Sequence, residues 1–336
     1  VISASVTNIA AGAFAGCASL KDVTVLATVP PSMDGGAFAG CGNLKNIFVP
    51  KGTVSAYKSA PGWSEYARII SVMHDLVVLN ADGSRATDSC YYWNEKAAIN
   101  ALVITREGLT VTGTTTTERV ELRDVQKLTL RDLYIDLAAN TNSGKTCLAP
   151  YNAKPVTVNV EGKVVMHTTS DAILMHDGGT LTIGGSGEIS MTVEKQYDAV
   201  YVYKGGGLVI ADSVNLMARC TIARAFSTDK VEGGAITISS SGRIDLRSES
   251  KAGIFAETAT GKLTIAPTAT NVVVRGFTPG KGGYLPGETG ALEFHVDDAV
   301  SLPSGWAIFG SPDIDAAAMP VAAELRQVPG TNTCTC

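Results

Sequence analysis

Residues Leu181-Thr182-Ile183 are one copy of an apolar–polar–apolar triplet that recurs through the middle of the chain. The seven copies begin 26, 28, 25, 27, 28 and 27 residues apart, and five of them place threonine at the centre. A period of this length is typical of a solenoid, in which each repeat buries its apolar face against the next repeat. The copies are residues 102–104, 128–130, 156–158, 181–183, 208–210, 236–238 and 263–265.

Two further strand-like segments complete each repeat. A second one follows the triplet, as in Ile189-Ser190-Met191, and a third follows later, as in Ala199-Val200-Tyr201. Glycine-rich corners such as residues 184–187 allow the positive φ that sharp bends need. Three short strands in about 27 residues, with alternating apolar side chains and no helix, predict an all-β solenoid of the parallel β-helix type over residues 73–310.

Composition narrows the class of protein. The chain has 336 residues, and its 27 Lys and Arg and 32 Asp and Glu residues are mixed along its length, for a net charge of -5. Nucleic acid is therefore not an expected partner, since no concentrated basic face is present. No apolar run approaches the roughly 18 residues of a membrane span. The seven cysteines are an odd number at wide intervals and predict no disulfide framework.

A different repeat occupies the start of the chain. Ala13-Phe14-Ala15-Gly16-Cys17 returns 24 residues later as Ala37-Phe38-Ala39-Gly40-Cys41, and each copy continues into a leucine and a short alternating strand. This pattern predicts a curved coil in which the phenylalanines and both cysteines point inward as buried side chains. Residues 51–72 change character, with helical spacing interrupted by Pro-Gly, and predict a cap over the end of the coil.

Both repeats resemble known families. Residues 13–25 and 37–50 resemble the BspA-like leucine-rich repeat, and residues 76–310 resemble the pectate-lyase-like right-handed, single-stranded parallel β-helix of bacterial surface and glycan-binding proteins. The resemblance implies a leucine-rich module with its cap in residues 1–72, a β-helix in 73–310 and a closing cap or tail in 311–336. It also implies an extracellular or cell-surface location, with no leader segment in this chain.

The residues that precede the third strands predict where chemistry could occur. Thr146, Asp171, Asp198, Arg224 and Lys251 fall one per repeat. Asp171 and Asp198 would lie about 4.8 Å apart, close enough to share a calcium ion or to act as an acid and base pair. Alternatively, Asp198 pairs with Arg224 in a surface ladder and Asp171 is solvated. If the protein is an enzyme, Asp171, Asp198, Arg224 and Lys251 are the catalytic candidates.

Tyrosines near the same edge predict a ligand surface. Tyr197, Tyr201, Tyr203 and Lys204 are the candidates, because tyrosine offers an apolar ring and a polar tip to a sugar. Most corners are short, which disfavours the walled cleft of an enzyme. We therefore expect a non-catalytic, adhesin-like binding module for a polysaccharide or for a host or bacterial surface protein, without a cofactor. The alternatives are a polysaccharide lyase or glycoside hydrolase, and a structural spacer.

Overall fold

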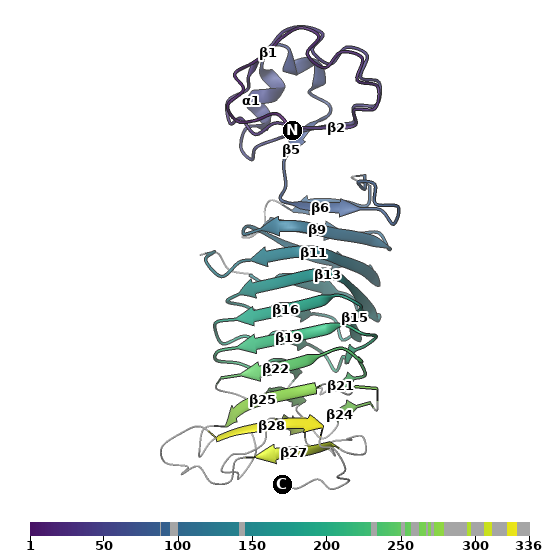
Figure 1. Cartoon of the computed structure of the whole chain (residues 1–336), viewed down its shortest axis with the longest axis vertical. Coiled ribbons are helices and arrows are strands. Elements are labelled where there is room, and N and C mark those ends of the chain that lie inside the picture. Colours follow the sequence, from purple (N-terminus) through teal and green to yellow (C-terminus); the bar gives the residue numbers. More distant parts are fainter. Residues whose placement is uncertain are drawn as a thin grey trace. The chain divides into compact units, whose positions relative to one another are not determined.

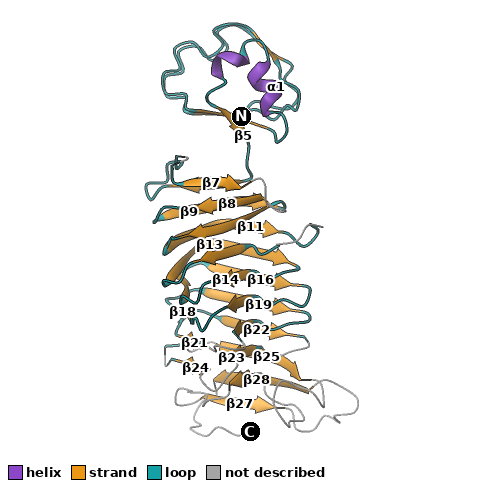
Figure 2. Cartoon of the chain, turned by 180° about the vertical axis from the view of Figure 1, so that it is seen from behind, coloured by secondary structure: helices purple, strands orange, loops and turns teal. Residues whose placement is uncertain are grey.

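The computed structural model describes residues 1–87, 89–94, 100–140, 145–229, 234–249, 253–256, 262–266, 268–269, 272–278, 294–296, 306–310 and 321–327. Over these residues the chain is an all-β, nearly helix-free solenoid of about nine turns with parallel strands (Figures 1 and 2), so this prediction is confirmed. The chain divides into two compact units, Val1–Asp75 and Leu76–Cys336. Within the described residues, no helix is long and apolar enough to cross a membrane.

The first unit stacks the two copies of its repeat. The strands pair in parallel, and Asp22 lies opposite Asn46 in the register that the 24-residue spacing predicts. The side chains of Phe14 and Phe38 stack with their ring centroids 5.0 Å apart. The elements are β1 (Asn8–Ile9), β2 (Asp22–Thr24), β3 (Ser32–Met33), β4 (Asn46–Val49), α1 (Val54–Ser59), the 3-10 helix η1 (Trp63–Tyr66) and β5 (Ile70–Val72).

Two aromatic side chains complete the core of this unit. Of the two cysteines predicted to be buried, only one is. Tyr57 and Trp63 are fully buried, and each donates a hydrogen bond to a backbone carbonyl of the preceding coil. Cys41 is buried beneath the first copy, where its thiol donates to the Phe14 carbonyl. Cys17 is exposed, so its predicted burial is wrong, because no earlier copy of the repeat in this sequence covers it.

The third strands of the second unit form a nine-stranded sheet. Its neighbours β12, β14, β17 and β20 pair in the register that the sequence period predicts. The step of 27 residues from Ala225 to Ala252 predicts Gly253 opposite Phe226, but Ile254 lies there, one residue later. The strands are β7 (Tyr91–Asn94), β8 (Asn100–Ile104), β10 (Glu118–Arg123), β12 (Leu148–Tyr151), β14 (Ile173–Met175), β17 (Val200–Val202), β20 (Phe226–Thr228), β23 (Ile254–Ala256) and β26 (Phe294–Val296).

The first and second strands share a fourteen-stranded sheet. The long strands β9 (Leu109–Thr115), β11 (Lys127–Asp136) and β13 (Val156–Thr168) run through the corner between them. Beyond β13, the first strands are β15 (Leu181–Gly185), β18 (Leu208–Ile210), β21 (Ala235–Ile238) and β24 (Lys262–Ile265). The second strands there are β16 (Glu188–Val193), β19 (Asn215–Cys220), β22 (Ile244–Ser248) and β25 (Val272–Thr278).

The register of the first strands holds in one part of the chain and shifts in another. Strands β15, β18, β21 and β24 pair in the predicted order and register. Leu128 pairs with Val158 rather than with Val156, an offset of two residues. A two-residue offset keeps each side chain on its predicted face, because the side chains of a strand alternate with a period of two.

Three segments take other places than the triplet pattern predicts. Residues 102–104 belong to β8, which pairs with β10 in the nine-stranded sheet, so they are a third strand and not a first one. The step of 29 residues from Leu263 to Leu292 predicts that residues 292–294 open a further rung, but β26 pairs with the third strand β23. The step of 26 residues from Leu76 to Leu102 predicts that residues 76–78 enter the first coil, but β6 (Leu76–Leu79) pairs antiparallel with β9. An apolar triplet fits each kind of strand equally well, so it does not identify the sheet.

Antiparallel strands lie at both ends of this stack. At one end, β6 pairs antiparallel with β9 and β7 with β8. At the other, β28 (Val321–Gln327) pairs antiparallel with β25, and β27 (Trp306–Gly310) pairs with β28. An uncovered parallel edge would leave a row of unpaired N–H and C=O groups that invites aggregation. The reversed strands cover edges of the parallel rungs.

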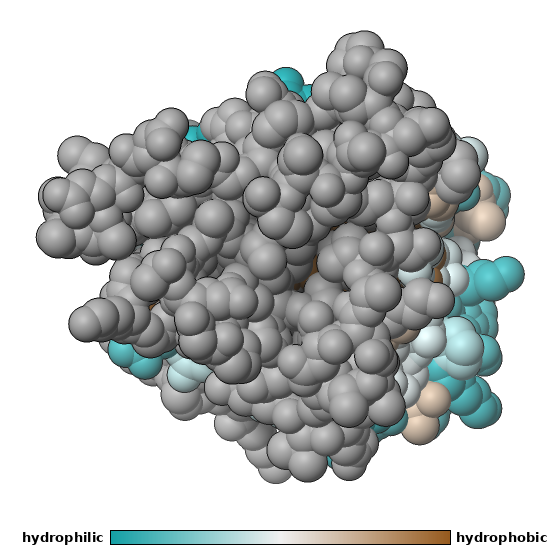
Figure 3. Space-filling model, turned by 90° about the horizontal axis from the view of Figure 1, so that it is seen from below, coloured by the Kyte–Doolittle hydropathy of each residue, from teal (hydrophilic) through white to brown (hydrophobic). Residues whose placement is uncertain are grey.

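The inward positions form stacked apolar rows. Leu181, Leu208 and Ile236 are fully buried, and each such side chain contributes about 1.5–3 kcal/mol before entropy offsets most of it. The outward positions are more polar, and the coloured surface in Figure 3 is mostly hydrophilic with a few hydrophobic residues. The outer faces of the sheets are therefore where a ligand would meet this unit.

Candidate functional site

The predicted acids form a buried ladder that holds neighbouring rungs together. The backbone N–H of Asp198 donates to Asp171 Oδ1 over 2.9 Å, and the N–H of Arg224 donates to Asp198 Oδ1 over 2.8 Å. Both acids are only 6% exposed. The structure thus brings Asp171, Asp198 and Arg224 together as predicted, but each acid binds the backbone of the next rung. Lys251 lies outside the described residues.

The second oxygen of Asp198 is also occupied. Asp198 Oδ2 accepts a hydrogen bond from the Ser227 hydroxyl and lies 3.7 Å from Arg224 Nη1. Ser227 and Arg224 are themselves buried. The predicted pairing of Asp198 with Arg224 is therefore present, but it is a buried ion pair and not a surface ladder. Asp171 is buried as well, so the expectation that it is solvated is wrong.

Burial gives Asp171 an unusual pKa. Loss of solvent, followed by repulsion from the Asp198 carboxylate, raises the pKa of Asp171 to about 7, while backbone hydrogen bonds oppose the rise. Such a carboxyl is part protonated near neutral pH. The described residues hold no cluster of three or more Asp, Glu, His or Cys side chains that could bind a metal ion. Calcium at Asp171 and Asp198 stays a prediction.

A second set of residues forms a column on the outer face of the nine-stranded sheet, one per rung except for Tyr201 and Tyr203, which share a rung. The Arg123 guanidinium lies 3.6 Å over the Tyr151 ring, and Tyr151 stacks on His176 with centroids 4.0 Å apart. His176 stacks in turn near Tyr203 at 6.3 Å, and Tyr201 lies beside Tyr203 at 4.4 Å. We call Arg123, Tyr151, His176, Tyr201 and Tyr203 the aromatic column.

Sequence reasoning found only the tyrosine end of this column. Arg123, Tyr151, His176 and Tyr203 are 28, 25 and 27 residues apart, the same spacing as the third strands. This spacing indicates the column only when the sheet register is known, because each of these four residues lies three residues beyond a buried core position of its rung. Tyr197 is not part of the stack, but its side chain is 49% exposed at the preceding turn.

The tyrosine and histidine members of the column present neutral polar groups to solvent. In the part of the chain that the structure describes, the hydroxyls of Tyr201 and Tyr203 make no hydrogen bond. Burial, with nearby carboxylates, raises the pKa of both tyrosines, so both keep their protons and can donate. Burial and the charge of Arg123 lower the pKa of His176 and favour its neutral form. Lys204, the last predicted ligand residue, pairs with Asp177 at 3.0 Å.

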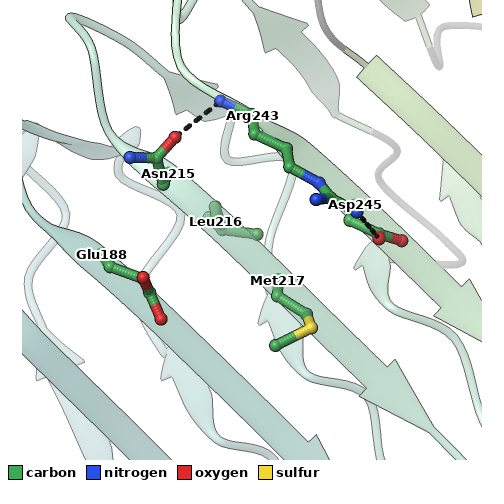
Figure 4. Close-up of a pocket in the computed structure, with 6 residues that line it drawn as sticks. All are labelled: Glu188, Asn215, Leu216, Met217, Arg243 and Asp245. Atoms are coloured by element: carbon green, nitrogen blue, oxygen red, sulfur yellow. Dashed lines mark hydrogen bonds and ion pairs between the residues drawn. The ribbon is translucent and has the colours of Figure 1, made fainter.

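A separate groove lies on the outer face of the fourteen-stranded sheet (Figure 4). Its volume is about 360 Å³, and its walls come from the consecutive second strands β16 and β19 and from the chain around the start of β22. None of its residues was predicted as a site, because Leu216 belongs to the core and the others occupy ordinary outward or turn positions. The lining residues are Glu188, Asn215, Leu216, Met217, Arg243 and Asp245.

Comparison with known proteins adds no relative. No protein-family model matches the chain, and no curated protein and no solved structure is significantly similar to it. The two outer faces and the buried ladder between rungs are therefore the features that indicate a function.

Proposed function

We propose that this chain belongs to an exported bacterial surface protein and binds a glycan through the aromatic column without changing it chemically. The observation that carries the proposal is the run of Tyr151, His176 and Tyr203 along successive rungs, with free tyrosine hydroxyls at one end. Because the rings stack on one another, their polar edges are the parts left for a ligand. Sugar hydroxyls suit such edges, since tyrosine oxygen both donates and accepts hydrogen bonds.

The buried ladder supports binding over catalysis. An acid and base pair must reach the reacting atoms of a substrate. Asp171 and Asp198 instead each accept a backbone N–H of the adjacent rung, and Asp198 also accepts from Ser227. These hydrogen bonds give both carboxylates a role in stabilising the fold, and that role needs no substrate. Polysaccharide is the partner that we favour, with a host or bacterial surface protein as the other expected partner.

The finer classification of the two units is part of the same proposal. We assign the unit Val1–Asp75 to the BspA-like leucine-rich type, on the repeated Ala-Phe-Ala-Gly-Cys motif and the stacking of Phe14 on Phe38. We assign the second unit to the right-handed, pectate-lyase-like type, on its three strands per rung. The extracellular or cell-surface location follows from these resemblances.

One observation favours the second candidate, a polysaccharide lyase or glycoside hydrolase. The pKa of Asp171, raised to about 7, is in the range that suits a general acid or base at neutral pH. In that case Asp171 and Asp198 would act with Arg224. The same raised pKa also follows from burial of a carboxyl in a fold-stabilising role, and so we rank this candidate second.

A glycan array combined with a turnover assay on acidic polysaccharides tests the proposal. Binding without product, weakened about tenfold or more in Tyr203→Ala and unchanged in Tyr92→Ala, is the expected result. Tyr92 is a matched control because it is 52% exposed on β7 and lies outside the column. Product formation that disappears in Asp171→Asn would establish the enzyme instead. If the unmodified chain shows neither binding nor turnover, the binding module and the enzyme are both contradicted and the structural spacer is favoured.

A further inference from the structure

The groove on the fourteen-stranded sheet has an apolar floor between polar walls. Figure 4 shows the Met217 side chain between Glu188 on one side and Arg243 with Asp245 on the other. Met217 is 39% exposed, a large fraction for an apolar side chain on a sheet. We call this feature, lined by the six residues given above, the Met217 groove. An apolar floor with polar walls suits a ligand with C–H faces and hydroxyl edges, as a sugar has.

One wall of the groove is held rigidly by ion pairs. The Asp245 carboxylate is 4% exposed and accepts from Arg247 Nε and Nη2 at 2.6 and 2.7 Å, and from Arg243 Nη2 at 3.2 Å. Arg243 keeps 64% of its side chain exposed. Its guanidinium is thus fixed at one nitrogen and offers its remaining N–H groups to a ligand. A preorganised donor loses less entropy on binding.

The other groups of the groove have open hydrogen-bonding positions. Asn215 Oδ1 accepts the backbone N–H of Arg243 at 2.8 Å, which fixes the amide and leaves its NH₂ group as a donor. The Glu188 carboxylate is exposed and makes no ion pair or hydrogen bond among the described residues. The groove therefore presents a carboxylate acceptor opposite amide and guanidinium donors. Sugar hydroxyls can satisfy both kinds of group.

The charges around the groove select against a charged ligand. Both signs of charge line the groove: Glu188 and Asp245 are negative and Arg243 is positive, while Arg247, outside the lining, pairs with Asp245. An acidic sugar would meet the unpaired Glu188 carboxylate, and a cationic ligand would meet the exposed Arg243. A neutral ligand meets neither penalty.

The floor of the groove continues along the solenoid. Tyr134 lies opposite Val165, Val165 opposite Ser190, and Ser190 opposite Met217, so these four outward residues form one row across β11, β13, β16 and β19. We call this row the axial strip. None of the four carries a charge, and Tyr134 is 39% exposed at its far end. With strands about 4.8 Å apart, the strip is roughly 14 Å long, which fits a chain of sugars better than one sugar.

We propose that the Met217 groove and the axial strip bind a neutral oligosaccharide of a few sugars, laid along the solenoid axis. The site is separate from the aromatic column, because it lies on the other sheet. Glu188, Asn215 and Arg243 would bind the hydroxyls of the terminal sugar, and the strip would contact the C–H faces of those that follow. This inference does not depend on glycan binding by the aromatic column.

Calorimetric titration of the full chain tests this site. The probes are neutral tetrasaccharides of glucose, mannose and galactose, with a tetragalacturonide as the charged counterpart. We expect at least one neutral probe to bind and the tetragalacturonide to bind at least about tenfold more weakly. Arg243→Ala and the nearly isosteric Glu188→Gln should each weaken the neutral probe about tenfold. Arg219→Ala is the control, an exposed arginine of the same sheet outside the groove.

Each other result of the titration is also decisive. The proposal is overturned if none of the three neutral probes binds, or if the tetragalacturonide binds as well as the neutral probes. It is also overturned if Arg219→Ala weakens binding as much as Arg243→Ala does. If Tyr203→Ala abolishes the binding and the groove variants do not, the sugar binds the aromatic column and the groove is empty. Thermal unfolding of each variant establishes that the loss is local to the groove.

Discussion

The backbone N–H of Asp198 donates to the Asp171 carboxylate over 2.9 Å, so the acid of one rung holds the chain of the next rung. The bond is repeated one rung later, where the N–H of Arg224 donates to Asp198. A buried N–H without a partner costs about 1–3 kcal/mol, and a turn before a strand lacks the ladder bonds that satisfy other amides. The two aspartates supply the missing acceptors. Their spacing of one rung, which indicated an acid pair, is the spacing that lets each aspartate accept a backbone N–H of the next rung.

Asp198→Ala should destabilise the second unit strongly. The change removes the acceptor of the Arg224 N–H and of the Ser227 hydroxyl, and it leaves the buried Arg224 guanidinium without its 3.7 Å counterion. Loss of one partner of a buried ion pair costs about 3–5 kcal/mol. Urea unfolding followed by circular dichroism measures the change. Asp177→Ala is the control, since its pair with Lys204 is exposed and contributes about 0–1 kcal/mol. Equal losses in the two variants would refute a buried role for Asp198.

Asp171 should make stability fall as the pH rises. Its pKa is raised to about 7 in the folded chain, above the usual 3.8, so the folded state holds a proton that the unfolded state releases between these values. The stability contribution is full below about pH 4 and is lost as the pH rises toward 7 and above. Asp171→Asn keeps an oxygen for the Asp198 N–H and cannot ionise. The variant should therefore exceed the unmodified chain in stability at pH 8, by on the order of a few kcal/mol.

The measurement for Asp171 is the difference in unfolding free energy between the two proteins from pH 4 to pH 8. Taking the difference cancels the other titrating groups that both proteins share. A difference that does not vary with pH would show that Asp171 ionises normally. His167 lies on the other sheet, so its effect on the pH dependence of stability can be tested independently of Asp171.

His167 should contribute stability at low pH. Its Nδ1 lies 3.2 Å from Asp136 Oδ1 and its Nε2 lies 2.8 Å from Glu194 Oε1. Burial lowers its pKa, but the bonds to Glu194 and Asp136 outweigh burial and raise the pKa overall. The contribution is thus full below the unfolded value of about 6.5 and is lost as the pH rises through the folded pKa. His167→Gln should cost about 1 kcal/mol at pH 5.5 and less at pH 9.

His176 is the control of opposite sign. Burial and the charge of Arg123 lower its pKa, so its protonation opposes folding and the folded state gains stability as the pH rises through 6.5. His176→Gln should therefore relieve a cost at pH 5.5 that is absent at pH 9. Urea unfolding at both pH values gives the two differences. If both histidine variants show the same trend, the carboxylate bonds of His167 do not control its titration.

The sequence predicts the stack of rungs better than it predicts faces and turns. The apolar triplets predict the order of β15, β18, β21 and β24. In β15, β18 and β21 each triplet buries its first and third side chains, as a period of two requires. Residues 102–104 are buried throughout in the other sheet, and nothing in an apolar triplet distinguishes the sheets. The sequence also could not predict that Leu128 pairs two residues beyond Val156, since a shift by two keeps the apolar side chains on the same face.

The sites were harder to predict for a physical reason. Asp171 and Asp198 precede strands, and in a turn the alternation of side chains no longer indicates which way a side chain points. Their proximity could be predicted from spacing, and their burial could not. The Met217 groove depends on register between β16 and β19 and on the fold of the chain before β22, so no single segment carries a motif for it. The aromatic column had a spacing signal that becomes informative only with the sheet register.

A side chain at Gly162 should destabilise the fold. The loss of unfolding free energy in Gly162→Ala can be divided into backbone strain and contact with a neighbouring side chain. Gly162 has φ of 61°, and a Cβ placed there would lie 2.1 Å from Asp132 Oδ1 of the preceding rung. Asp132 Oδ1 also accepts the N–H of Lys163 at 3.2 Å, so it cannot move away freely. Gly108 has a similar φ of 72° with nothing near its Cβ position. Gly108→Ala should thus report the backbone strain alone, about 1–2 kcal/mol, and Gly162→Ala should cost about 1–3 kcal/mol more.

A double-mutant cycle at this corner assigns the excess to the contact. Asp132→Gly removes the carboxylate that the new methyl group would meet, and it should reduce the cost of Gly162→Ala to that of Gly108→Ala. The cycle compares urea unfolding of the unmodified chain, both single variants and the double variant. If Gly162→Ala costs no more than Gly108→Ala, or if Asp132→Gly leaves its cost unchanged, the rungs are not in tight contact at this corner. The coupled result would establish that neighbouring rungs meet there through one carboxylate and one glycine.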